Sequence, residues 1–111
     1  MLKGKNAIIT GSTSGIGLGV AHKLATEGCN ITINGFGEKS LIDSISNEIT
    51  NKYGVKVLYS NADMSKPEQI RDMVEGTIKN HGSVDILVNN AGIQHVEHTS
   101  SMPSTTASID A

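Results

Sequence analysis

Short apolar runs alternate along the chain with longer segments in which apolar residues recur every four positions. The runs cover residues 7–10, 31–33, 55–59 and 86–88. Short continuous runs rich in aliphatic and β-branched residues are typical of strands buried on both faces of a parallel sheet. We therefore predict four strands, each joined to the next by a helix.

Each segment between these runs carries one apolar stripe at helical spacing. The stripes are Ile16, Val20 and Leu24 in the first segment, Leu41, Ile45 and Ile49 in the second, and Ile70, Val74 and Ile78 in the third. A four-residue repeat of this kind predicts an amphipathic helix with that stripe facing the core.

The ends of these helices also have sequence signals. Ser40 is placed to cap the second helix, and the segment 65–68 (Ser-Lys-Pro-Glu) predicts a capping box with Ser65 as the cap of the third. A glycine follows each stripe and predicts its end: Gly28, Gly54 and Gly82.

The predicted order β-α-β-α-β-α-β defines an α/β fold class, a partial Rossmann-like doubly wound parallel sheet. Right-handed crossovers place the first two helices on one face and the third on the other, which gives the strand order 3-2-1-4. We expect residues 1–96 to form this single domain. The carboxyl ends of the first and fourth strands then flank the crevice where such sheets bind ligands.

A glycine-rich turn, Thr-Gly-Ser-Thr-Ser-Gly-Ile-Gly at residues 10–17, follows the first strand and opens the first helix. Gly11 permits a tight turn, Gly15 lets the backbone approach a pyrophosphate, and Gly17 lets the helix pack closely. The free N–H groups of the helix start favour an anion, and the hydroxyls of residues 12–14 add donors. A turn with no ligand is the alternative interpretation. A Walker-type phosphate loop is excluded, because no Gly-Lys-Ser/Thr closes the turn.

Two motifs meet at the predicted crevice, the turn at 10–17 and Asn-Asn-Ala-Gly at 89–92. Their pattern resembles the classical short-chain dehydrogenase/reductase family. The blocks 2–5, 11–19, 34–37, 54–59 and 89–95 are similar to the D-3-hydroxybutyrate dehydrogenases of bacteria within it. The resemblance extends to about Val96. It implies an oxidoreductase that uses the nicotinamide dinucleotide NAD and interconverts 3-hydroxybutanoate and acetoacetate.

The turn and the resemblance together imply a set of cofactor-binding residues: Gly11, Thr13, Ser14, Gly15, Ile16, Gly17, Phe36, Asp63, Met64, Asn90, Ala91 and Gly92. Asp63 would accept a hydrogen bond from the adenine amino group, or it turns the chain before Ser65. Phe36 would pack near the adenosine, or it only covers the sheet edge. Gln94 matches the position that binds the substrate carboxylate, or it is a solvated amide.

The end of the second strand bears on the choice between NAD and NADP. An acidic residue there accepts the ribose hydroxyl of NAD, whereas an arginine favours the 2′-phosphate of NADP. Residues 34–37 (Asn-Gly-Phe-Gly) contain neither, and Lys39 is the nearest cation. The missing arginine and the resemblance together favour NAD.

The family's proton donor is a tyrosine with a lysine four residues later, assisted by a serine. Tyr53 and Tyr59 are the two tyrosines here, and Val57 and Asp63 stand four residues after them. We therefore name no catalytic residue. We expect residues 1–111, by themselves, not to turn substrate over.

Composition argues against two further classes of function. A net charge of −2 and an aromatic content of 3% predict no basic or base-stacking surface that would bind nucleic acid or an anionic membrane. The single cysteine, Cys29, fits a small buried residue and a reducing compartment. No signal peptide or membrane span is evident, so we expect a cytoplasmic protein. The four histidines lack metal-ligand spacing, and the Ser/Thr-rich segment 97–111 is expected to be a disordered tail.

Three functional hypotheses follow. The first is the NAD-binding part of a hydroxybutyrate-type dehydrogenase, inactive alone. The second is a non-catalytic dinucleotide-binding or interaction module. The third, a flavodoxin-like binding domain, is disfavoured because two separate motifs resemble one family.

Overall fold

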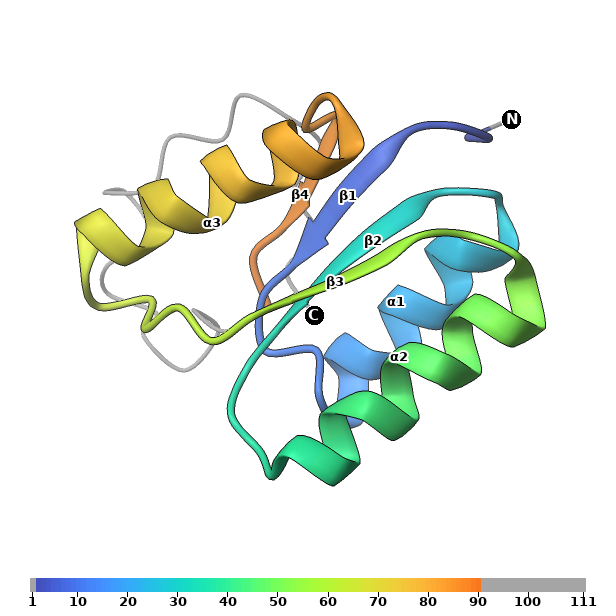
Figure 1. Cartoon of the computed structure of the whole chain (residues 1–111), viewed down its shortest axis with the longest axis horizontal. Helices are drawn as coiled ribbons and strands as arrows, with labels where there is room; N and C mark the ends of the chain where they lie inside the picture. Colours follow the sequence, from blue (N-terminus) through green and yellow to red (C-terminus); the bar gives the residue numbers. More distant parts are fainter. Residues whose placement is uncertain (1, 91–111) are drawn as a thin grey trace.

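A computed structural model describes residues 2–90 of the chain as four strands alternating with three helices (Figure 1). In chain order the elements are β1 (Asn6–Ile9), α1 (Gly15–Thr26), β2 (Asn30–Asn34), α2 (Lys39–Tyr53), β3 (Val57–Ser60), α3 (Pro67–His81) and β4 (Ile86–Val88). The four strands lie where the apolar runs predicted them, with bounds shifted by no more than two residues.

The strands form one parallel sheet in the order β3-β2-β1-β4. Ile8 in β1 stands opposite Thr32 in β2 and Leu87 in β4. Helices α1 and α2 cover one face of the sheet and α3 covers the other (Figure 1). The doubly wound α/β fold and the strand order 3-2-1-4 are therefore confirmed.

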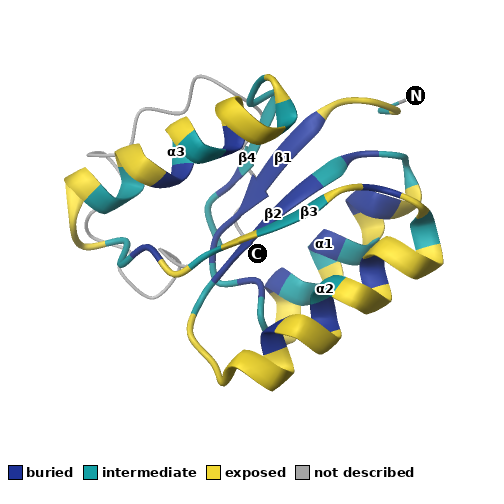
Figure 2. Ribbon diagram, in the orientation of Figure 1, coloured by how far each residue is buried: buried dark blue, intermediate teal, exposed yellow. Residues whose placement is uncertain are grey.

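The two faces of the sheet have cores of unequal size. Alternation along β1 sends Ala7 and Ile9 into a cluster with α1 and α2, and Ile8 into a small cluster with Ala62 and Met73 under α3. In Figure 2 the buried side of each helix faces the sheet and the exposed side faces solvent. Cys29 is fully buried in the larger cluster, as its apolar surroundings predicted.

The predicted helix stripes were wrong in part. Ile16, Leu41 and Ile78 are 60%, 48% and 47% exposed. The buried faces lie mostly on neighbouring positions: Gly17, Ala21, Leu24 and Ala25 in α1, Ile42, Ile45 and Ile49 in α2, and Met73 and Thr77 in α3. Small residues carry little hydrophobic signal, yet they let a helix approach the sheet closely, and this shifts the contact face.

The predicted helix starts were also wrong. The N-cap positions of α2 and α3 are Glu38 and Lys66, not Ser40 and Ser65, and neither makes a side-chain cap bond. The Ser65 hydroxyl instead donates to the Asp63 carboxylate. The glycine stops are confirmed for α2 and α3, since Gly54 and Gly82 adopt left-handed φ values of +71° and +107°.

None of the helices within residues 2–90 is both long and apolar enough to cross a lipid bilayer.

Candidate functional site

The glycine turn connects β1 to α1 at the carboxyl edge of the sheet. Gly11 and Gly15 have φ values of +60° and +59°, a region that residues with a side chain rarely adopt. A β-carbon on Gly17 would collide with the carbonyl oxygen of Gly11 and would lie 2.7 Å from the side-chain nitrogen of Asn90. The start of α1 is therefore packed directly against the turn, and only glycine permits this.

The amino end of α1 has the character of an anion site. Ser14, the N-cap residue, is extended and makes no side-chain cap bond, and the first turn contains no acidic residue. The N–H groups of Gly15, Ile16 and Gly17 have no partner within the helix, because a helix leaves its first donors unsatisfied. Together with the helix dipole they favour a phosphate group at this position.

The ends of β1 and β4 converge as the topology predicted. The Thr10 amide donates to the Val88 carbonyl at 3.0 Å, and the Asn90 side-chain nitrogen donates to the Gly11 carbonyl at 3.0 Å. This bond joins the two motifs that the sequence placed at one crevice. Three other predicted site residues, Ala91, Gly92 and Gln94, lie outside the described residues.

The three hydroxyl residues of the turn are not equivalent. The Ser12 hydroxyl is buried and donates to the Ile9 carbonyl at 2.8 Å, while the Asn34 amide donates to its oxygen at 2.9 Å. The expectation that Ser12 offers a donor to an anion was therefore wrong. The Thr13 hydroxyl contacts the Phe36 carbonyl at 3.3 Å, and Ser14 is exposed.

Sequence reasoning missed Asn34, the last residue of β2. Its side chain is 2% exposed. The amide oxygen accepts from the Gly11 N–H at 3.2 Å, and the amide nitrogen donates to the carbonyls of Ser60 and Ala62 at 3.1 and 3.0 Å. A polar residue between a buried strand and a glycine was the available signal, but spacing alone does not reveal partners on three segments.

No carboxylate is offered at the end of β2. Asn34 is committed to main-chain groups, and Gly35 has φ +144° with the Thr13 hydroxyl oxygen 2.8 Å from where a β-carbon would lie. The Tyr59 hydroxyl donates to the Gly35 carbonyl, which fixes this corner further. Phe36 belongs to the loop between β2 and α2 and is 70% exposed to solvent.

The nearest cation along the chain, Lys39, is already paired. Its ammonium nitrogen lies 2.8 Å from the Asp43 carboxylate one helical turn away. The hydrogen bond and the charge of Asp43 both raise the pKa of Lys39.

Asp63 and Met64 follow β3 on the same edge of the sheet. The Asp63 carboxylate accepts from the hydroxyl and the N–H of Ser65 at 2.7 and 2.9 Å, and these two bonds lower the pKa of Asp63. The turn-forming role of Asp63 is therefore present. Met64 is partly buried and packs against the small cluster under α3.

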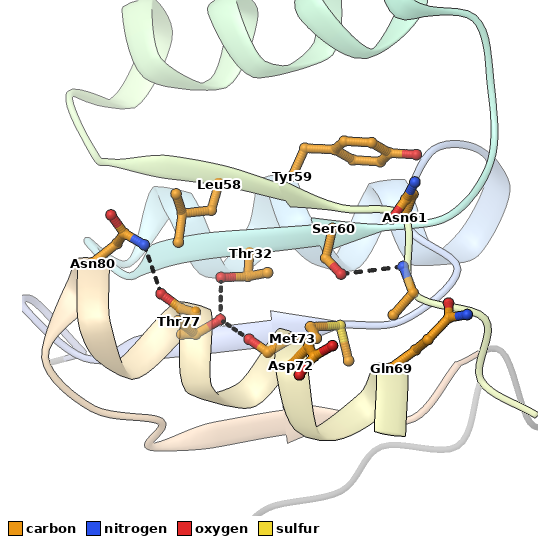
Figure 3. Close-up of a pocket in the computed structure, with 12 residues that line it drawn as sticks. Thr32, Leu58, Tyr59, Ser60, Asn61, Gln69, Asp72, Met73, Thr77 and Asn80 are labelled. Atoms are coloured by element: carbon orange, nitrogen blue, oxygen red, sulfur yellow. Dashed lines mark hydrogen bonds between the residues drawn. The ribbon is translucent and has the colours of Figure 1, made fainter. Parts of the chain in front are cut away.

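A separate hollow of about 710 Å³ opens between α3 and the strands β2 and β3 (Figure 3). Its floor includes the buried pair Thr32 and Thr77, whose hydroxyl oxygens are 2.8 Å apart. Its rim reaches Gln69, whose side-chain oxygen accepts from the Asp63 N–H at 2.8 Å. The hollow therefore ends beside the carboxyl edge but does not include the glycine turn.

Among residues 2–90, no three His, Cys, Asp or Glu side chains gather as a metal site would require. His22 instead contacts the Tyr53 hydroxyl at 2.9 Å, and His81 lies 3.3 Å from the Ile31 carbonyl.

The parallel βα units and the glycine turn closed by Asn90 define a dinucleotide-type α/β domain. Residues 5–110 match the short chain dehydrogenase family, and the chain belongs to that family. The match extends to residue 110, so the expectation that the resemblance ends near Val96 was wrong.

The relatives include D-beta-hydroxybutyrate dehydrogenases of two bacteria. The chain is 51% identical to that of Cupriavidus necator over 104 residues, which are 93% of this chain and 39% of that protein. It is 48% identical to that of Rhizobium meliloti over 99 residues, 89% of this chain and 38% of that protein. The chain thus spans about two fifths of the length of these relatives.

Solved structures of the family share the fold. L-sorbose reductase from Gluconobacter frateurii, complexed with NADPH and L-sorbose, is 38% identical with a TM-score of 0.74, and the match covers 80% of this chain and 34% of that one. A short chain dehydrogenase from Burkholderia cenocepacia in complex with NADP is 34% identical with a TM-score of 0.75, covering 83% and 37%.

Proposed function

We propose that the chain is the NAD-binding portion of a short-chain dehydrogenase that interconverts (R)-3-hydroxybutanoate and acetoacetate. The observation that carries the proposal is the bond from the Asn90 side chain to the Gly11 carbonyl, which brings both nucleotide motifs together. The similarity to the D-beta-hydroxybutyrate dehydrogenase of Cupriavidus necator supports the substrate class.

In this proposal the residues around the glycine turn hold the two phosphates of the cofactor. The N–H groups of Gly15, Ile16 and Gly17 face the pyrophosphate, and Gly11, Thr13 and Ser14 shape the turn beneath it. Asp63 and Met64 border the adenine, Phe36 covers the adenosine, and Asn90, Ala91 and Gly92 border the ribose. NAD supplies the hydride acceptor.

The sequence at the end of β2 supports NAD over NADP. Residues 34–37 (Asn-Gly-Phe-Gly) carry no arginine or lysine, so a 2′-phosphate would meet no cationic side chain from these four residues. Calorimetric titration tests this: we expect tighter binding of NAD than of NADP. Equal or tighter binding of NADP would contradict the preference.

The proton donor is the part of the reaction for which residues 1–111 contain no family motif. Neither Tyr53 nor Tyr59 is followed by lysine four residues later. Gln94 is the proposed contact for the substrate carboxylate. We expect these 111 residues, purified, to bind NAD without reducing it in the presence of 3-hydroxybutanoate. Appearance of NADH absorbance above a protein-free blank would overturn this expectation.

A non-catalytic dinucleotide-binding or interaction module is the second candidate. Both candidates bind NAD, so binding does not separate them. A downstream coding segment with that motif, in or out of frame, supports the dehydrogenase portion, and its absence supports the module. For either candidate we propose a cytoplasmic location, because the lone cysteine is free and buried.

A further inference from the structure

We infer that Asn34 is a positioning residue of the dinucleotide site. Its buried amide holds the glycine turn against the ends of β2 and β3, so that the N–H groups at the start of α1 stay directed at the pyrophosphate. The inference rests on the proposed NAD site and extends it to a residue that no nucleotide motif contains.

Both side-chain donors and the side-chain oxygen of Asn34 are engaged by the protein itself. An amide offers two N–H donors and one carbonyl acceptor. Here the donors reach the carbonyls of Ser60 and Ala62, and the acceptor takes the Gly11 N–H. With 2% exposure, Asn34 is buried, and its side chain contacts the turn through the Gly11 N–H.

The backbone of Asn34 adds to the same connection. The Ser12 N–H donates to the Asn34 carbonyl at 2.6 Å, and the Asn34 N–H donates to the Ser12 hydroxyl oxygen at 2.9 Å. Residues 11 and 12 are thus tied to one residue of β2 through side chain and main chain together.

Gly11 is consequently held from both neighbouring strands. Asn34 at the end of β2 accepts its N–H, and Asn90 after β4 donates to its carbonyl. Because Gly11 has a left-handed φ and no side chain, these bonds are what define its orientation. Loss of one of them frees one of the two peptide planes that meet at Gly11.

The substitution Asn34→Asp separates this role from direct cofactor contact. The new side chain is nearly the same size, but its carboxylate has no N–H to donate to Ser60 and Ala62 and would face two buried carbonyls. In the general dinucleotide pattern an acidic residue at the end of the second strand binds the ribose and favours NAD. That pattern predicts stronger NAD binding for Asn34→Asp, whereas the geometry predicts weaker binding.

Asn6 provides a matched control at the opposite edge of the sheet. It is 3% exposed and its amide donates to the His81 carbonyl and the Ser83 hydroxyl, at 3.2 and 2.9 Å. Asn6→Ala removes a buried amide of the same kind from the same sheet, far from the glycine turn.

The experiment compares the parent chain with Asn34→Asp, Asn34→Ala and Asn6→Ala under conditions where circular dichroism shows each to be folded. NAD affinity is measured by calorimetry, and amide hydrogen exchange of residues 11–17 is measured by NMR. We expect both Asn34 variants to bind NAD about tenfold more weakly and to exchange these amides faster. For Asn6→Ala we expect affinity and exchange at the turn to stay within about twofold of the parent.

Two results would overturn the inference: unchanged affinity in Asn34→Ala, or an equal loss in Asn6→Ala. If the Asn34 variants do not fold, Ser12→Ala replaces them, since it removes the hydroxyl that accepts from the Asn34 N–H; unchanged exchange of Gly11 and Thr13 in that variant would contradict the inference. Failure of the parent to bind NAD is a separate result. It rejects the proposed function, while the exchange rates still decide whether Asn34 orders the turn.

Discussion

At residue 17 the chain has no space for a side chain, because the Gly11 carbonyl oxygen occupies the position of a β-carbon. Gly19, two residues further along the same helix, has nothing within 4 Å of its own β-carbon position. The two glycines therefore have different roles within one helix. Gly17 is required by packing, and Gly19 is not.

We predict opposite effects for alanine at these two positions. Gly17→Ala forces α1 away from the turn and costs about 3 kcal/mol of unfolding free energy, with loss of NAD binding. Gly19→Ala adds a favourable helical residue at an exposed position and stabilises by about 0.5–1 kcal/mol. Urea unfolding and NAD titration check both variants, and equal stability of the two would contradict the packing argument.

A second prediction concerns acid. The N–H of Asn6 and the hydroxyl of Ser83 both donate to the Asp85 carboxylate and lower the pKa of Asp85. A pKa lowered by folding means that Asp85 contributes stability above its unfolded pKa, about 3.9, and that this contribution disappears as the pH falls through its folded pKa.

The measurement is the urea midpoint between about pH 6 and pH 2 for the parent chain and for Asp85→Asn. We expect Asp85→Asn to be less stable at the upper end of this range and to lose less stability on acidification than the parent chain. Parallel pH profiles for the two chains would show that the bonds to Asp85 add nothing.

At the scale of elements, α3 is joined to the sheet through a buried polar contact. The Thr77 hydroxyl lies 2.8 Å from that of Thr32 in β2 and also contacts the Met73 carbonyl at 3.0 Å (Figure 3). The small cluster of Ile8, Ala62 and Met73 lies on the same face of the sheet. The contact between these two hydroxyls therefore helps to fix the position of α3 on the sheet.

We predict strong coupling between Thr32 and Thr77. Thr77→Val removes the partner of the buried Thr32 hydroxyl and costs about 1–2 kcal/mol. Thr32→Val costs less, because the Thr77 hydroxyl keeps its bond to the Met73 carbonyl, and the double change costs less than the sum of the two. A double-mutant cycle from urea unfolding measures the coupling. Additive costs would indicate that the two hydroxyls do not depend on each other.

The helices and strands also show which parts of the fold can be predicted from the sequence. Strand identity, order and handedness were predictable, because buried parallel strands are continuous apolar runs and crossovers are right-handed. The contact faces of the helices were not, because Gly17, Ala21 and Thr77 are buried by close approach and look weakly apolar in a sequence. Within the candidate site, motifs predicted that the glycine turn and Asn90 lie together, and the bond between Asn90 and Gly11 confirms that placement. Asn34 was missed because its role depends on partners 23 to 28 residues away.

At the scale of the whole molecule, the two faces of the sheet differ in how much they bury. Among residues 2–90, the cluster beneath α1 and α2 contains thirteen buried residues and the cluster beneath α3 contains three. Local stability follows buried apolar contact, so α3 is expected to open more readily than α1.

Amide hydrogen exchange measured by NMR tests this asymmetry. We predict that the central amides of α3 exchange about tenfold or more faster than those of α1, which corresponds to roughly 1.4 kcal/mol or more in opening free energy. The central amides of β1 serve as the internal reference, because β1 contributes to both clusters. Equal protection in α1 and α3 would show that the smaller cluster holds its helix as firmly as the larger one.

The bond between Asn90 and Gly11 joins residues 79 positions apart. A ribosome therefore releases the glycine turn long before it releases Asn90. For the NAD site proposed above, we expect the affinity of the nascent chain for NAD to rise in one step when the segment after β4 leaves the exit tunnel.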